Sequence, residues 1–549
     1  MQAYARPFFQ FCYYLLTVII LSACHGQDEE APPAVVDSNF SAPQLTQTVA
    51  LGGNVTGLTE GSRLTLTNQG VENMTLTANG EFRFTTPLAP DTAYNVTITS
   101  QPTELICDLT NGTGTLGSSD NTALLIACRH WEAAQPLGAN DAGSAHSPHL
   151  AVNNAGEAIV VGYQQESGRY RIIAHRYTPQ SGWENTTPIE TLSEGYPAQL
   201  QVALNAQGSA IAVWRRQVGV QSDLWAAYYS VGRGWGPATR LTQGENGRDY
   251  SPTVAMDGSG NALLLWSQSD GQQFQLWANR YVANSGWDNP TLVTPHAMPR
   301  AQLSRVVLNE RGEGLALWAQ VDTDATQTTL WANHFTMSSG WESPTAIVSR
   351  DIGGYPGYHL AIDNLGRVMA IWTQIYNQHH DTQIATSRYL PGEGWTTPAV
   401  ITPTKLAFLD TTSPYIAVDN TGNAMAVWIQ YDYPTGYVWA NRFDSERGWG
   451  EAQRIDSQQL WDATYPKVAM DDQGNAVAVW SQDDNRFIRN IRANHYLANA
   501  GWGHDRLLEE NNTGDAERPQ VGIDGTGQAT VVWAQRDGVR NAIWTNRYR

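Results

Sequence analysis

The fold is decided by the stretch PTVAMDGSGNALLLWSQSDGQQFQLWANRYVANSGWDNPTLV at residues 252–293, which holds one complete copy of a repeat. A short apolar run, 252–256, ends in Asp257-Gly-Ser-Gly260, where Asp can bond the local backbone and Gly tolerates positive φ. Residues 262–268 are almost all apolar, as in a strand buried on both faces. Residues 276–281 indicate a third strand, and Gly286-Trp287 leads into a fourth that ends near Val293. The stretch therefore predicts a four-stranded unit.

Two markers of this unit recur in phase along the chain. The first is a Trp, usually after Gly, at spacings of 52 to 54 residues: Trp131, Trp183, Trp235, Trp287, Trp341, Trp395, Trp449 and Trp502. The second is an Asn or Asp with Gly three residues later: Asn153/Gly156, Asn205/Gly208, Asp257/Gly260, Asn309/Gly312, Asp363/Gly366, Asp419/Gly422, Asp471/Gly474 and Asp524/Gly527. Repeats of about 50 residues with four strands each are typical of propeller blades, so the sequence predicts an all-β fold with an eight-bladed β-propeller over residues 129–549.

The phase of the repeat predicts how the propeller closes. The chain stops at Arg549, just after the third strand of its last unit, 543–548. The segment Trp131 to Leu137 matches the fourth strand of the later units. We therefore expect 3+1 closure, in which three C-terminal strands pair with one strand from the start of the domain.

A small β-domain is expected over residues 45–128. Alternating runs at 49–51, 64–66, 74–76, 82–84 and 94–98 predict strands, and Asn79-Gly80 between two of them predicts a hairpin. Cys107 and Cys128 are the two cysteines that follow residue 24, and we expect them to form a disulfide. On a chain-entropy model this bond would stabilise the fold by about 3 kcal/mol. The strand number suggests an Ig-like sandwich. The segments 52–57 and 111–114 resemble an Ig-like module of bacterial surface lipoproteins.

The N-terminus is interpreted as an export signal. Residues 1–23 contain Arg6 and a short apolar run, and end in Leu21-Ser-Ala directly before Cys24. This resembles the lipobox of bacterial lipoproteins, which implies lipidation of Cys24. His25 stands where lipoproteins retained at the inner membrane have Asp, so in a Gram-negative source the resemblance implies outer-membrane localisation, on the periplasmic or the surface face. A transmembrane anchor and a non-lipidated signal are the alternatives. Residues 24–44 are expected to be the lipidated cysteine and a flexible tether.

The net charge of −19 argues against nucleic acid as a partner, because proteins bind its negatively charged phosphates mainly through Lys and Arg. We expect a monomer that touches the membrane only through its lipid anchor. The partner is expected to be a glycan or an envelope protein.

Candidate ligand-binding residues lie where the repeat is broken, on the connections that share one face of the propeller. They are Trp461, Asp462, His379, His380, Asp381, Asp432, Asp483 and Asp484, with Asp322, Asp324 and Asp537 on equivalent loops. Aromatics with carboxylates suit a sugar or a peptide, and calcium is possible, although no other cofactor is expected. The alternative is a solvated acidic surface.

A Trp-x-Gln pair recurs on the second strand of most units. The copies are Trp266/Gln268, Trp318/Gln320, Trp372/Gln374, Trp428/Gln430, Trp480/Gln482 and Trp533/Gln535. A ring of ligand-stacking pairs is one interpretation. Packing between blades is the favoured one, because large aromatics dominate cores.

The chain has none of the common hydrolase, zinc or phosphate-loop motifs, and no catalytic residue is assigned. Its repeat style resembles the sialidase-like (BNR) propellers, but Gly follows Asp by three residues instead of two. The favoured hypothesis is a membrane-anchored envelope binding protein. The alternatives are a glycan-cleaving enzyme and a structural scaffold of an envelope complex.

Overall fold

A computed structural model describes the chain from residue 47 to its end, with gaps. The described residues are 47–102, 105–138, 143–242, 248–269, 273–294, 301–321, 328–349, 357–375, 381–403, 410–432, 435–456, 461–484, 486–509, 514–536, 538 and 540–549. Most of these residues lie in strands. The described part of the chain has no helix long and apolar enough to cross a membrane. Cys24, the signal peptide, the tether, His379, His380, Asp322, Asp324 and Asp537 lie outside the described residues.

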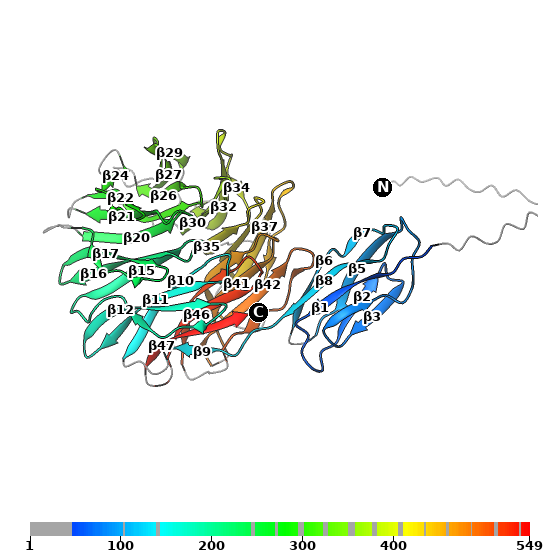
Figure 1. Ribbon diagram of the computed structural model, residues 1–549. Coiled ribbons are helices and arrows are strands. Elements are labelled where there is room, and N and C mark those ends of the chain that lie inside the picture. The colour runs from blue at the N-terminus through cyan, green and yellow to red at the C-terminus, as the bar shows by residue number, and fades with distance from the viewer. Residues whose placement is uncertain are drawn as a thin grey trace, which may run out of the picture.

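The first unit is a β-sandwich, drawn in blue to cyan in Figure 1. Its strands are β1 (Leu51–Thr56), β2 (Leu64–Asn68), β3 (Glu72–Leu76), β4 (Gly80–Arg83), β5 (Ala93–Ser100), β6 (Ile106–Thr110), β7 (Thr113–Thr115) and β8 (Asn121–Arg129). They form two four-stranded sheets, ordered β4-β1-β8-β6 and β3-β2-β5-β7. Alternating side chains such as Leu51, Leu64 and Leu66 point between the sheets and form a core of their own.

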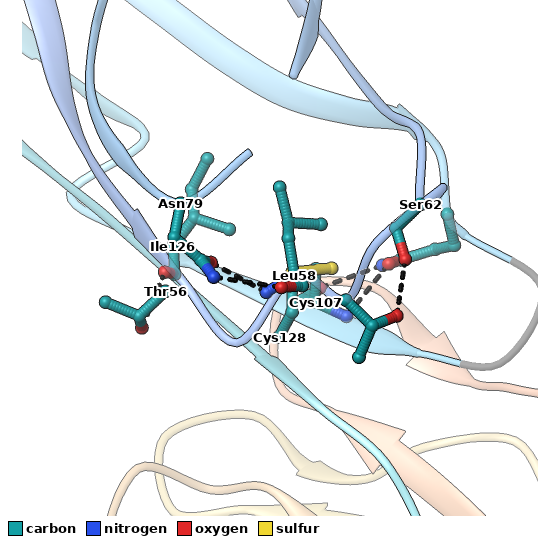
Figure 2. Close-up of a disulfide and its surroundings, with 9 residues drawn as sticks. Thr56, Leu58, Ser62, Asn79, Cys107, Ile126 and Cys128 are labelled. Carbon is teal, nitrogen blue, oxygen red and sulfur yellow. Dashed lines mark hydrogen bonds between the residues drawn. A yellow bond between two sulfur atoms is a disulfide. The ribbon is translucent and has the colours of Figure 1, made fainter. Parts of the chain in front are cut away.

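The hairpin predicted at Asn79-Gly80 is wrong. The strands on either side of it, β3 and β4, pair with different sheets. The Asn79 side chain instead acts like a neighbouring strand: its Oδ1 accepts from the Leu58 N–H at 2.8 Å and its Nδ2 donates to the Leu58 C=O at 2.9 Å (Figure 2). An Asn-Gly pair therefore serves here to join two loops.

The predicted disulfide between Cys107 and Cys128 is confirmed. The two residues lie directly opposite each other on β6 and β8, so the bond links neighbouring strands of one sheet (Figure 2). The Gln101 side chain also bonds both the N–H and the C=O of Cys107. The disulfide thus fastens the edge strand β6 to the sandwich.

The second unit is a β-propeller built from successive antiparallel meanders. The first strands of the meanders are β10 (Ser144–Val152), β15 (Tyr196–Leu204), β20 (Arg248–Met256), β25 (Ala301–Leu308), β30 (Tyr358–Ile362), β35 (Asp410–Val418), β40 (Ala463–Met470) and β45 (Ala516–Ile523). The second strands are β11 (Ala158–Glu166), β16 (Ala210–Val218), β21 (Ala262–Ser269), β26 (Glu313–Val321), β31 (Val368–Ile375), β36 (Ala424–Asp432), β41 (Ala476–Asp483) and β46 (Ala529–Arg536).

The third strands are β12 (Arg169–Thr178), β17 (Gln221–Ser230), β22 (Phe274–Val282), β27 (Thr328–Thr336), β32 (Thr382–Leu390), β37 (Thr435–Asp444), β42 (Arg489–Leu497) and β47 (Asn541–Tyr548). Each fourth strand but one is split into two short pieces. The pieces are β13 (Gly182–Trp183) and β14 (Thr187–Pro188), β18 (Gly234–Trp235) and β19 (Thr239–Arg240), β23 (Gly286–Trp287) and β24 (Thr291–Leu292), β28 (Gly340–Trp341) and β29 (Thr345–Ser349), β33 (Gly394–Trp395) and β34 (Ala399–Val400), β38 (Gly448–Trp449) and β39 (Gln453–Arg454), and β43 (Gly501–Trp502) and β44 (Arg506–Leu507). The fourth strand predicted from Gly286 to near Val293 is present as the two pieces β23 and β24.

The ends of the propeller meet in one sheet. β9 (Gln135–Leu137) pairs with β47 in the order β45-β46-β47-β9, as the phase of the repeat predicts. Each first strand contacts the first strand of the next meander, and β10 contacts β45. The first strands therefore form a ring, and the chain termini of the propeller close it.

The Asn/Asp…Gly marker forms the turn between the first and second strands in every meander. The marker side chain accepts hydrogen bonds from the N–H groups two and four residues later, as Asp257 does from Ser259 and Asn261. Each marker Gly has φ between 78° and 91°, which a side chain would strain. We call the edge of the propeller that holds these turns, 153–156 to 524–527, the turn face.

The Trp-x-Gln pairs pack between meanders, as predicted. Every Trp of this column is at most 1% exposed. The indole Nε1 donates to the Gln Oε1 two residues later at 2.9 to 3.4 Å in the pairs Trp372/Gln374, Trp428/Gln430, Trp480/Gln482 and Trp533/Gln535. These residues are part of the core and are not available to a ligand.

The sandwich rests on the turn face of the propeller. Asn499, between β42 and β43, donates to the Asp108 Oδ1 and to the Leu109 C=O at 3.2 and 3.1 Å. Arg129 donates to the C=O of Thr526, in the turn between β45 and β46, and Ile106 packs against the core beside β47. The opposite edge, where the first strands begin and the second strands connect to the third, is left uncovered by the sandwich; we call it the rim face.

Candidate functional site

The rim face carries an exposed aromatic pair. Trp461 precedes β40 and Phe487 lies in the loop between β41 and β42; their rings are 5.6 Å apart. The Trp461 side chain is 44% exposed and that of Phe487 70%. In the equivalent place of three other meanders the chain has Gly143, Gly195 or Gly514. The aromatic pair is therefore an addition to the repeat.

Asp484 builds the turn that presents Phe487. Its Oδ1 accepts from the N–H groups of Arg486 at 2.7 Å and Ile488 at 3.0 Å. Phe487 itself has φ of 59°, a conformation that few non-glycine residues adopt. Asp484 was predicted from the sequence, whereas Phe487 was not, because it belongs to no periodic marker.

Asp462 and Asp483 join Trp461 to its neighbours. The Trp461 N–H donates to the Asp483 C=O at 3.3 Å, and the Asp483 N–H donates to the Asp462 C=O at 3.1 Å. The carboxylate of Asp483 lies 3.2 Å from the Arg489 Nε. The structure therefore brings together four of the predicted residues, Trp461, Asp462, Asp483 and Asp484.

The Asp462 carboxylate has a role that recurs in the repeat. It accepts from the Gly436 N–H of the preceding meander at 2.6 Å. The equivalent Asp410 accepts from the Thr382 hydroxyl, and Asp515 accepts from the Arg489 N–H. Asp462 therefore links adjacent meanders and positions Trp461, which lies next to it in sequence.

The remaining predicted residues are spread over the neighbouring meanders. Asp432 is exposed at the end of β36, opposite Thr435, next to the Gly436 that bonds Asp462. Asp381 is half-buried one meander earlier, directly before β32. No group of three or more His, Cys, Asp or Glu side chains suited to a metal ion occurs in the described parts of the chain. Calcium stays a prediction.

A second feature, which the sequence analysis missed, is a ring of side chains at the centre of the propeller. Seven of the first strands have a bulge near their start, and the described part of β30 pairs without one. The residue after each bulge, and His359 at the same position of β30, lines the centre: His149, Gln201, Thr253, Arg305, His359, Tyr415, Lys467 and Gln520. They line a cavity of about 450 Å³. All eight stand four residues before the Asn/Asp marker, so aligning the repeats on the marker would have found them.

The central cavity is closed in enough to alter its basic groups. Burial and the nearby Arg305 lower the pKa of Lys467 to about 7. Burial lowers the pKa of His149 to about 4, with Lys467, Arg305 and Arg518 adding to the effect. Burial also lowers the pKa of His359. The His359 ring stacks on Tyr415 at 3.6 Å, and the Lys467 Nζ lies 4.0 Å from the Tyr415 ring centre.

The comparisons with known proteins show no family for this chain. No protein-family model matches the chain, and no curated protein matches it. Similar solved structures include a protein of unknown function from Dyadobacter fermentans (12% identity, 65% of this chain and 95% of that chain, TM-score 0.38) and the β-propeller domain of the Trilobed protease from Pyrococcus furiosus (9% identity, 67% and 95%, TM-score 0.39). A polysaccharide lyase of family PL25, an ulvan lyase, is similar at 10% identity over 69% and 96% of the two chains, with a TM-score of 0.42.

These identities and TM-scores are too low to transfer an activity to this chain. The strand order, the repeat and the central ring define its class on their own. The chain is an all-β protein in which a β-propeller follows a β-sandwich.

Proposed function

We propose that this chain is a lipid-anchored binding protein of the cell envelope, and that the rim face of its propeller binds a glycan. In this proposal the meanders are the eight blades of the propeller, β1–β8 is an Ig-like spacer, and Cys24 carries the lipid. The observation that carries the proposal is the exposed pair Trp461–Phe487.

The aromatic pair suits a sugar ring. Exposed indole and phenyl faces offer apolar area that water solvates poorly, and they have few rotatable bonds to order on binding. The carboxylates around them, including the exposed Asp432, can accept hydrogen bonds from sugar hydroxyls. A turn strained at Phe487 and held by Asp484 is a further sign of a built surface.

The arrangement of the two units supports this choice of face. The sandwich bonds to the turn face through Asn499 and Arg129. A lipid on Cys24 would attach the protein through the sandwich, which covers part of the turn face. The rim face, which the sandwich does not cover, would stay accessible to ligands.

A glycan array tests the proposal. The probe is residues 25–549, with and without calcium, as wild type and as the variants Trp461→Ala and Phe487→Ala. We expect selective binding that each variant weakens about tenfold or more, since a buried aromatic contact contributes on the order of 1.5 kcal/mol or above. Leu365→Ala is the matched control, because Leu365 is 50% exposed on the turn face.

Two results would count against this function. Glycan binding that survives both aromatic substitutions would place the site elsewhere on the chain. If the folded protein binds no glycan on the array, a glycan is excluded as its ligand. The favoured hypothesis would then be that the rim face binds an envelope protein, either as a ligand or as a partner in a larger complex.

A further inference from the structure

The central cavity is basic in a protein that is strongly acidic. The chain has a net charge of −19 and only two lysines, yet one of them, Lys467, lines the cavity together with Arg305. His149 and His359 complete the basic set. None of the described residues that line the cavity is Asp or Glu. The local charge is thus opposite to that of the whole chain.

The two cations are half-buried and have no carboxylate beside them. Arg305 donates from Nη1 to the Ser304 C=O at 3.3 Å, and Lys467 lies over the Tyr415 ring at 4.0 Å. Neither forms an ion pair with a carboxylate of the described chain. Two like charges facing one enclosed space repel each other, and an anion between them would relieve that repulsion.

The rest of the ring can also donate hydrogen bonds. Gln201, Thr253, Tyr415 and Gln520 occupy the same position of the repeat as the basic residues, and all carry N–H or O–H groups. The mouth of the cavity adds Tyr465, and Arg518 lies 5.8 Å from the Tyr465 ring centre. A cavity of about 450 Å³ is within the usual range for small-molecule sites.

We propose that the central cavity binds an organic carboxylate, with Arg305 and Lys467 on the carboxylate and the half-exposed Tyr465 ring against the carbon skeleton. The planar guanidinium of Arg305 matches a carboxylate in two hydrogen bonds. The ligand is either an acidic sugar or a free small acid. This site is independent of the rim pair Trp461–Phe487.

Calorimetry on residues 25–549 tests the site with three probes: glucuronate, succinate and the uncharged control glucose. We expect glucuronate or succinate to bind and glucose not to bind. Preference for glucuronate would identify an acidic sugar, and preference for succinate a free acid. Binding should weaken as the pH rises through the Lys467 pKa of about 7, where Lys467 loses its charge among Arg305, Arg518, His149, His359 and Tyr415.

The matched variants are Arg305→Gln and Lys467→Gln, because Gln201 and Gln520 already hold glutamine at this position of the ring. Each should fold, with an unchanged or higher melting temperature, and should weaken binding about tenfold or more. Arg233→Gln, at an exposed arginine outside the cavity, and Trp461→Ala should bind as the wild type does. Equal binding of glucose, no binding of either acid, or full binding by both ring variants would overturn the proposal.

Discussion

Trp480→Ala should lower the free energy of unfolding by about 3 to 5 kcal/mol, the usual cost of emptying a buried tryptophan site. Trp480 is 0% exposed and packs between two meanders with Met425, Val427 and Val468. Its Nε1 also donates to the Gln482 Oε1, and the Gln482 Nε2 donates to the Trp461 C=O. The substitution would therefore loosen both the core and the rim segment above it.

Trp461→Ala is the matched control for that experiment. Because Trp461 is 44% exposed, its removal should cost clearly less than the Trp480 substitution, on the order of 1 kcal/mol. Urea titrations followed by circular dichroism measure both values. Similar losses in the two variants would contradict the division into structural and ligand-facing tryptophans.

Glu509→Gln should stabilise the protein at alkaline pH. The Glu509 side chain is 1% exposed after β44, and its Oε2 accepts from the Ile491 N–H at 2.9 Å. Burial raises the pKa of its carboxyl from 4.5 to about 8, and the Ile491 N–H and the charge of Arg492 only partly oppose this. The native state therefore keeps a proton that the unfolded chain loses.

The sign of the pH effect follows from that difference in bound protons. Stability contributed by a raised pKa is complete below the unfolded value of 4.5 and is lost as the pH rises to about 8. The loss is on the order of 5 kcal/mol at most. Glutamine keeps the hydrogen bond and never ionises, so the variant should lose less stability between pH 5 and pH 8.5 than the wild type.

Thermal melts across this pH range measure the effect. Glu446→Gln, at an exposed carboxyl, should leave the pH dependence as it is in the wild type. A wild-type stability that is flat from pH 5 to pH 8.5, or parallel curves for the wild type and Glu509→Gln, would contradict a buried neutral Glu509.

Most of the propeller could be predicted because its determinants are local and repeated. Each Asn/Asp…Gly turn needs only five consecutive residues, as from Asp257 to Asn261. The closing strand β9 followed from the phase of the repeat. The sandwich was harder, since Asn79 serves a contact 21 residues away that no local pattern reveals.

The site could be predicted only in part. Trp461 stood out in the sequence because it breaks the repeat. Asp462, Asp483 and Asp484 lie near it because the end of β41 is next to the start of β40 in the meander. The central ring was missed because its residues share a position and not a residue type. Lys467 and Thr253 can both donate hydrogen bonds, but they differ in charge and size, so no sequence motif describes both.

Hydrogen–deuterium exchange of residues 25–549, with and without the glycan that binds best on the array, tests the central claim most directly. We expect protection confined to the rim face, at 461–464 and 483–488, with the turns 153–156 to 524–527 and the sandwich unchanged. Protection of the turn face or of the sandwich, with no change at Trp461 or Phe487, would contradict it.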